Sequence, residues 1–299
     1  MKDEIRKKNN TLNAYLFLSP ALIVLLFIFG YQIVRLFWFS LVKWEGYIYT
    51  TEFSNFLYYK QLFTKDMVFK SLFRSFIIIA VVLPVVIFAT VFIVHNIYRK
   101  VSGWKFYRWL FFLPAIIPIV VQAIIWQYLL NINGPLNTIL KALRLEFLVI
   151  DWFGNSKTAI FALCWVIIWR ELGFSTVIFL AELAHIPPSL YESAMIDGAN
   201  EWRLMRHITL PHLSRIIKLY IITMTIFILN NLFSIIFAST NGGPGYATMV
   251  LEYYIYLTAF RYTKTGLGTT IAVLLFLITM VLVIIYLRAS SKKKLEGVF

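Results

Sequence analysis

The stretch Pro187–Pro211, PPSLYESAMIDGANEWRLMRHITLP, is a polar segment between two long apolar segments. Ser189 followed by Glu192 predicts a capping box, and therefore a short helix that begins here. Asp197 and Gly198 predict a turn, after which Asn200 is expected to cap a second short helix that ends by Pro211. The pattern predicts a helix–turn–helix knob in water. An amphipathic linker that merely joins two membrane spans explains it equally well.

The composition on both sides of this stretch is that of an integral membrane protein. The chain is 60% hydrophobic and 14% charged, with a mean hydropathy of +0.77, whereas soluble domains carry about 25% charged residues. The net charge of +14 is interpreted as Lys and Arg that hold cytoplasmic loops inside, so no nucleic-acid partner is expected. The lone Cys164 excludes an internal disulfide and a thiolate metal site.

Six apolar runs are long enough to cross a bilayer, which predicts an all-α integral membrane protein with six transmembrane helices. They cover about 15–40, 72–97, 109–130, 158–180, 213–238 and 267–287. Pro84 is expected to kink the second, and Pro114 and Pro118 to break the third. The first run is too long for a secretory signal and stays as a span. The prediction is an N-terminal tail over 1–14, a transmembrane domain over 15–287 and a basic tail over 288–299.

Charge indicates how these spans are oriented. Six spans place both termini on one side, and the ends and loops of that side carry more Lys and Arg than the other side. Both termini are therefore expected in the cytoplasm. The loop over 187–211, between spans four and five, is then cytoplasmic too.

The loops on the other side are predicted to be polar and rich in aromatic residues. The first is expected to form an interfacial belt, with sugar stacking as the alternative; its aromatic residues are Trp44, Tyr47, Tyr49, Tyr58 and Tyr59. A short helix is expected around 136–143.

Polar residues inside the spans are candidates for a solute pathway, with interhelical hydrogen bonding as the open alternative. They are Gln122, Trp126, Gln127, Asn230, Asn231 and Ser234. The adjacent pair Arg170 and Glu171 points to different helix faces, so these two are not expected to pair with each other.

Motifs for catalysis are missing from the sequence. It contains no P-loop and no recognisable Ser, His and Asp set. His207 and His212 do not have the spacing of a helical metal pair, and Pro211 intervenes. We therefore expect no catalytic residue and no metal site, and a membrane enzyme is the less favoured alternative.

Eight residues of the polar stretch have the spacing of the EAA loop of bacterial ABC importer permeases: Glu192, Ala194, Asp197, Gly198, Ala199, Ile208, Leu210 and Pro211. The stretch resembles that loop with two departures, since Ser193 replaces the middle Ala and Met205 replaces the usual Phe. In the family this loop is the coupling helix, which seats in a cleft of the ATPase subunit. The resemblance implies a coupling role for Tyr191, Glu192, Ser193, Ala194, Asp197, Gly198, Ala199, Trp202 and Met205.

Three further segments resemble the MalF-like permeases that import carbohydrates: Leu16–Gly46, Trp109–Asn131 and Thr240–Thr248. The resemblance implies that the chain forms half of a sugar pathway in a bacterial cell membrane, beside a second and different permease. It also implies two ATPase subunits, which bind ATP and Mg while this chain binds no cofactor, and an extracytoplasmic solute-binding protein. That protein is expected to dock at Gly242, Gly243, Pro244 and Gly245. A polyol, a glycerol phosphate or an ion-coupled secondary transporter are the alternatives.

Overall fold

The computed structural model describes residues 15–46, 48–100 and 103–296. The predictions on the tail over 1–14, on Tyr47 and on 297–299 lie outside the described residues. The chain forms two compact units. One combines the residues up to Lys65 with Ile255–Phe276, and the other combines Asp66–Tyr254 with the residues from Leu277 onward.

The first unit contains the first predicted span and a hairpin that was not predicted. A helix covers Tyr15–Leu41, includes the π-turn η1 (Leu26–Gly30) and ends as α2 (Tyr31–Leu41). The antiparallel strands β1 (Val42–Glu45) and β2 (Ile48–Phe53) follow, and α3 (Leu57–Thr64) comes after them. Gly46 makes the tight turn possible because its φ of +61° suits glycine.

Tyr58 corrects the prediction of an aromatic belt. Its side chain is 3% exposed, and its hydroxyl oxygen accepts a hydrogen bond from the Trp44 backbone N–H at 3.1 Å. Tyr58 therefore joins α3 to the hairpin. The hairpin escaped prediction because it is short and because its aromatic residues fit an interfacial loop as well as a strand.

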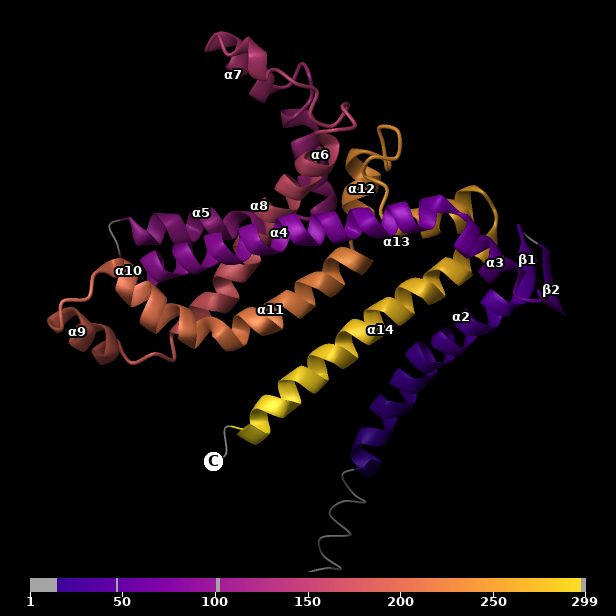
Figure 1. Ribbon diagram of the computed structural model, residues 1–299, viewed down its shortest axis with the longest axis horizontal. Coiled ribbons are helices and arrows are strands. Elements are labelled where there is room, and N and C mark those ends of the chain that lie inside the picture. The colour runs from indigo at the N-terminus through magenta and orange to yellow at the C-terminus, as the bar shows by residue number, and fades with distance from the viewer. Residues whose placement is uncertain (1–14, 47, 101–102, 297–299) are drawn as a thin grey trace, which may run out of the picture. The chain divides into compact units, whose positions relative to one another are not determined.

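The second unit is built on helices packed side by side: α4 (Asp66–Tyr98), α5 (Trp104–Ile116), α8 (Ala159–Leu183) and α11 (Leu210–Asn230). α8 contacts both α4 and α5, and α11 contacts α4 and α8 (Figure 1). Their shared core is fully buried at Val82, Val86, Leu163, Ile167 and Ile228.

The third predicted span is sharply bent. α5 and α6 (Ile119–Leu129) meet at 105°, with Pro118 as the N-cap of α6. The bend exposes backbone carbonyls that need partners. Gln122 supplies them, because its Nε2 donates to the carbonyls of Pro114 and Ile117, both at 2.7 Å.

Beyond α6 the chain continues into α7 (Pro135–Ala142) and the 3-10 turn η2 (Glu146–Leu148), and α7 agrees with the short helix predicted there. The fifth span does not run to Ala238 as predicted. α11 ends at Asn230, and α12 (Phe233–Ser239) follows after a break and packs against α6.

The last elements are α13 (Leu251–Tyr256), the π-turn η4 (Leu257–Arg261) and α14 (Thr265–Glu296). Among the described residues, five single helices are long and apolar enough to cross a membrane, and the bent pair of α5 and α6 makes a sixth when it counts as one span. The span prediction is thus confirmed apart from element boundaries and the hairpin.

Candidate functional site

The polar stretch forms two helical arms, α9 (Pro188–Ile196) and α10 (Glu201–Leu204) with the π-turn η3 (Met205–Thr209). The predicted capping box is wrong. α9 begins at Pro188, and its N-cap Pro187 makes no side-chain hydrogen bond. Because Pro188 starts the helix one residue before Ser189, the Ser189 hydroxyl lies inside the first turn and cannot cap it.

The turn between the arms is as predicted. Gly198 has a φ of +81°, and the N–H groups of Gly198 and Ala199 donate to the carbonyls of Met195 and Ala194 at 3.0 and 2.9 Å. This is the hydrogen-bond pattern of a glycine-terminated helix. Asn200 then caps α10, since its Oδ1 accepts from the Arg203 N–H at 2.9 Å.

The second arm does not end at Pro211. Helix continues from Glu201 through η3 into α11, and Pro211 lies in the first turn of α11. A proline can occupy this position because the π-turn shifts the hydrogen-bond ladder just before it. The second arm is therefore continuous with a membrane helix, and its motion is tied to that helix.

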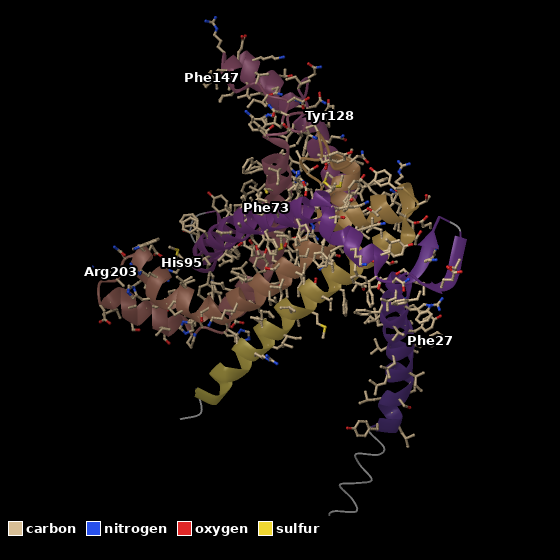
Figure 2. All side chains as sticks on the ribbon, turned by 45° about the vertical axis from the view of Figure 1, so that its right-hand side comes forward. Phe27, Phe73, His95, Tyr128, Phe147 and Arg203 are labelled. Atoms are coloured by element: carbon tan, nitrogen blue, oxygen red, sulfur yellow. The ribbon has the colours of Figure 1, made fainter. Side chains whose placement is uncertain are left out.

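A chain of hydrogen-bonded side chains joins both arms to α4, and all but the last of them, Glu201, are buried. The Tyr191 hydroxyl of α9 lies 2.8 Å from Thr209 Oγ1, Thr209 Oγ1 lies 2.8 Å from His95 Nδ1, and His95 Nε2 lies 3.2 Å from a carboxylate oxygen of Glu201. His95 is 4% exposed and Thr209 is fully buried. Figure 2 shows His95 at the same end of the helices as Arg203 of α10.

With a neutral imidazole, one set of donors satisfies the whole chain. The Glu201 carboxylate can only accept, so His95 Nε2–H donates to it. His95 Nδ1 then accepts from the Thr209 hydroxyl, which in turn accepts from Tyr191. Burial raises the pKa of the Tyr191 phenol, so this hydroxyl keeps its proton at neutral pH.

Four more contacts close this network. The Tyr98 hydroxyl donates to the Ile186 carbonyl at 2.8 Å, and the Tyr98 and Tyr191 rings lie 5.5 Å apart. Arg99 lies over the Tyr191 ring and 3.4 Å from Glu201 Oε1. The sequence analysis missed His95, Thr209 and Glu201 as a set. The sequence signal that could have identified them was a histidine near the end of an otherwise apolar run, together with a threonine among the last residues of the polar stretch.

The outer face of the arms is apolar and open. Ile196 is 86% exposed and Trp202 is 58% exposed, and Glu192, Ser193, Asp197 and Gly198 are exposed beside them. Ala194 and Ala199 line a hollow of about 240 Å³. By contrast, Tyr191 and Met205 are buried. The predicted coupling residues thus divide into an exposed set and a supporting set.

The pathway candidates are placed at the bend and at the break after α11. Gln122 is buried and holds the bend, as described above. Gln127 Nε2 donates to the Ser239 carbonyl of α12 at 2.9 Å, and Asn230 Nδ2 donates to Ile226 O and Thr279 Oγ1. Asn231 is exposed and Ser234 is half-buried.

Trp126 belongs to an aromatic cluster. Its ring meets those of Trp165 and Trp169 edge-on, with centroids 5.9 and 5.5 Å apart. The Trp126 Nε1 atom is buried and has no hydrogen-bond partner in the part of the chain that the structure describes. An unpartnered indole N–H beside two further aromatic faces suits a hydroxyl-rich solute.

Arg170 and Glu171 do pair, contrary to the prediction. Arg170 Nη1 donates to Glu171 Oε1, because the long arginine side chain folds back along α8. Tyr220 of α11 donates to the other carboxylate oxygen at 3.3 Å, and the guanidinium lies 4.7 Å from the centre of the Phe227 ring. Glu171 is 3% exposed, and the Arg170 side chain remains partly exposed.

The glycine-rich segment after α12 is internally braced. Gly242 has a φ of +81°, and a Cβ there would lie 2.7 Å from Met249 Cε. Thr248 Oγ1 donates to the Gly243 carbonyl at 2.8 Å, and Tyr253 donates to Asn241 Oδ1 at 3.2 Å. Gly243, Pro244 and Gly245 therefore present a rigid surface.

Glu252 connects this segment to the break after α11. Its Oε2 accepts from the backbone N–H groups of Leu232 and Phe233 at 2.8 and 2.9 Å. These N–H groups are among those at the N-terminus of α12 that have no acceptor within the helix. Burial raises the pKa of the Glu252 carboxyl, although both backbone donors oppose the shift. In the described part of the chain, no group of His, Cys, Asp and Glu could hold a metal ion.

Known proteins resemble the chain in both sequence and fold. The family described as "Binding-protein-dependent transport system inner membrane component" matches residues 96–296. The trehalose/maltose transport system permease protein MalF of Thermococcus litoralis is 30% identical over 286 residues, which are 94% of each chain. The sulfoquinovosyl glycerol transport system permease protein SmoG of Agrobacterium fabrum is 31% identical over 94% of this chain and 91% of that protein.

A solved structure shares the fold. A chain of a bacterial ABC transporter involved in the import of the acidic polysaccharide alginate superposes with a TM-score of 0.79 at 22% identity, over 97% of this chain and 99% of the other. Because the family matches most of the sequence, the chain belongs to the inner membrane components of binding-protein-dependent transport systems, the non-catalytic permease subunits of ABC transporters.

Proposed function

We propose that this chain forms half of the translocation pathway of an ABC importer for a carbohydrate, and that it receives the work of ATP hydrolysis through residues 187–211. The named relatives support a carbohydrate, since their names specify trehalose/maltose and sulfoquinovosyl glycerol, and the structural neighbour imports alginate. A polyol or a glycerol phosphate is the alternative within the same class.

The observation that carries the coupling role is the hydrogen-bonded chain from Tyr191 through the buried Thr209 and His95 to the exposed Glu201. It holds the two arms and α4 as one body. A push on the exposed face at Ile196 and Trp202 is therefore passed to α4, and through η3 it is passed to α11. Rigid elements joined by hydrogen bonds can carry such motion between sites.

The solute pathway is proposed at the other polar positions of the second unit. Trp126 offers an unpartnered N–H beside the aromatic rings of Trp165 and Trp169. Gln127, Asn231 and Ser234 offer amides and a hydroxyl near the breaks in the spans. The Arg170–Glu171 pair adds charged hydrogen-bonding groups, which are costly in a membrane unless they face a partner or a wet cavity. Gln122 and Asn230 hold these breaks in place.

The proposed assembly contains a second permease, two ATPase subunits that bind ATP and Mg, and an extracytoplasmic solute-binding protein. The ATPase meets the exposed face of α9 and α10 in the cytoplasm, where both termini also lie. The solute-binding protein meets the braced segment Gly242–Gly245. The rigidity of that segment favours docking, because little conformational entropy is lost on binding.

The test replaces two apolar side chains that are exposed and therefore contribute little to folding. Ile196→Ser combined with Trp202→Ser should leave the chain folded but reduce co-purification of the ATPase subunit at least tenfold, because apolar anchors dominate such interfaces. Phe147→Ser is the matched control, since Phe147 is 79% exposed on the η2 turn; Figure 2 shows it well away from Arg203.

Equal ATPase binding by the double variant and by the control would refute the coupling role. Uptake that required an ion gradient and proceeded without the ATPase would instead identify a secondary transporter.

A further inference from the structure

A large groove lies beside the coupling arms, between the end of α4, the first turns of α5, the last turns of α8 and α9. Its volume is about 1090 Å³. Among the described residues that line it, four are basic and one, Glu192, is acidic. The basic residues are Arg99, Lys100, Lys105 and Arg108. The groove is therefore an electropositive concavity. It lies at the end of the helices to which residues 187–211 are attached.

Most of this positive charge is uncompensated. Arg99 meets Glu201, but within the described residues Lys100, Lys105 and Arg108 form no ion pair with an acidic side chain. Basic side chains therefore outnumber acidic ones by four to one among the described lining residues, and such a cluster attracts an anion more strongly than scattered surface charges do.

Two buried polar atoms in the groove also lack partners. Thr176 is 2% exposed, and its Oγ1 has no hydrogen-bond partner among the described residues. The Arg99 Nε atom is likewise buried and unpartnered. Buried polar groups without partners are rare in folded proteins and indicate a missing ligand or water. Both residues line the groove, although these two atoms are themselves covered.

The rest of the wall is apolar and continues onto exposed helix faces. Trp109, Phe112 and Val177 line the groove and are 61%, 41% and 43% exposed. They belong to α5 and α8, which have the composition of membrane spans. Trp104 lies at the start of α5, next to the basic residues, as tryptophans do at a membrane–water boundary.

We propose that this groove binds an anionic phospholipid, with the headgroup phosphate among the basic side chains and Thr176, and with an acyl chain along Trp109, Phe112 and Val177. A basic pocket between membrane helices, joined to an apolar wall, is the arrangement that selects an anionic lipid. An acidic surface of a partner subunit would match the charges but not this wall. The proposal does not depend on which solute the chain transports.

The test measures lipid retained by the full chain. The chain is reconstituted with equal amounts of phosphatidylglycerol and phosphatidylcholine, and the lipid that stays bound is counted by native mass spectrometry. The wild type should retain phosphatidylglycerol in preference. Lys105→Gln combined with Arg108→Gln should weaken retention about 30-fold, because each basic residue near an anionic lipid contributes about a fivefold factor.

Arg206→Gln combined with Arg215→Gln is the matched control. Both residues are exposed and basic, and neither lines the groove. This control should retain phosphatidylglycerol as the wild type does. Thr176→Val should also lower retention without lowering thermal stability, because the hydroxyl that it removes has no partner within the chain.

Three results would overturn the proposal. They are equal retention of both lipids by the wild type, equal loss in the test and control variants, and loss of phosphatidylglycerol from the wild-type chain once the ATPase and second permease are bound. The last result would assign the groove to a protein partner.

Discussion

At the scale of single residues, His95 links segments that are far apart in the sequence. Its two ring nitrogens reach Thr209 and Glu201, which lie on different parts of the second coupling arm. A buried network of this kind specifies one arrangement, because any displacement leaves polar groups unpaired in a low-dielectric interior.

His95→Ala should therefore destabilise the chain by about 2 kcal/mol, since it removes the acceptor of the buried Thr209 hydroxyl and opens a cavity. In the assembled transporter it should also lower the number of solute molecules moved per ATP hydrolysed. Thermal unfolding and paired uptake and hydrolysis assays measure the two effects.

His212→Ala is the control, because His212 is exposed and its ring Nδ1 lies 2.7 Å from a carbonyl of its own continuous helix, Ile208 O. If His95→Ala and His212→Ala moved the same number of solute molecules per ATP hydrolysed, the role of His95 would be structural only.

Glu252 makes stability depend on pH. Its raised pKa means that the folded state holds the proton more tightly than the unfolded state. The resulting stabilisation is complete below the ordinary pKa of a glutamate and is lost as the pH rises through the higher, folded-state value. Glu252→Gln resembles the protonated form, so its unfolding temperature should lack this fall in the pH range above the ordinary glutamate pKa of about 4.3.

A matching fall in the wild type and in Glu252→Gln would assign the pH dependence to another group. Glu252→Ala should cost about 2 kcal/mol of stability at any pH in this range, because two backbone N–H groups lose their acceptor.

At the scale of elements, the contact between α5 and α8 depends on a small residue. A Cβ on Gly173 would lie 2.8 Å from the Phe111 carbonyl and 3.1 Å from Ala115 Cβ. Membrane helices pack closely where small residues let the backbones approach.

Gly173→Val should separate α5 from α8 and destabilise the chain by about 2 kcal/mol. Gly30→Ala is the matched control, since a Cβ at Gly30 meets nothing within 4 Å and alanine favours a helix. Thermal unfolding of both variants in detergent measures the difference. An unfolding temperature of Gly173→Val equal to that of the control would show that the α5–α8 contact tolerates a larger residue.

At the scale of the whole molecule, the orientation in the membrane can be tested with cysteines. Cys164 is the chain's own cysteine and is 2% exposed, so background labelling should be low. Ser193→Cys places a thiol on the coupling arm, and Phe147→Cys places one on the η2 turn.

A membrane-impermeant maleimide should label Phe147→Cys in intact cells. It should label Ser193→Cys only in inverted membrane vesicles. These vesicles are prepared from cells that lack the ATPase subunit. The opposite pattern would reverse the topology and would place the coupling loop out of reach of an ATPase.

Most of the fold was predictable because its strongest signals are local. Long apolar runs identify spans, and Asp197, Gly198 and Asn200 specify the turn and the cap of the coupling loop without help from the rest of the chain. The predictions were less accurate where two local rules conflicted. Pro188 overrode the capping box at Ser189, and the π-turn η3 carried the helix past Pro211.

The sequence by itself determined that this is a membrane protein with six apolar segments and a polar loop between the fourth and fifth, because hydropathy and turn chemistry act over short distances. Only the tertiary structure decided that His95 joins both arms to α4, that Arg170 pairs with Glu171, and that an electropositive groove forms beside α9. Each of these depends on residues that are distant in sequence, or on rotamers that the packed bundle selects, and periodicity carries no information about either.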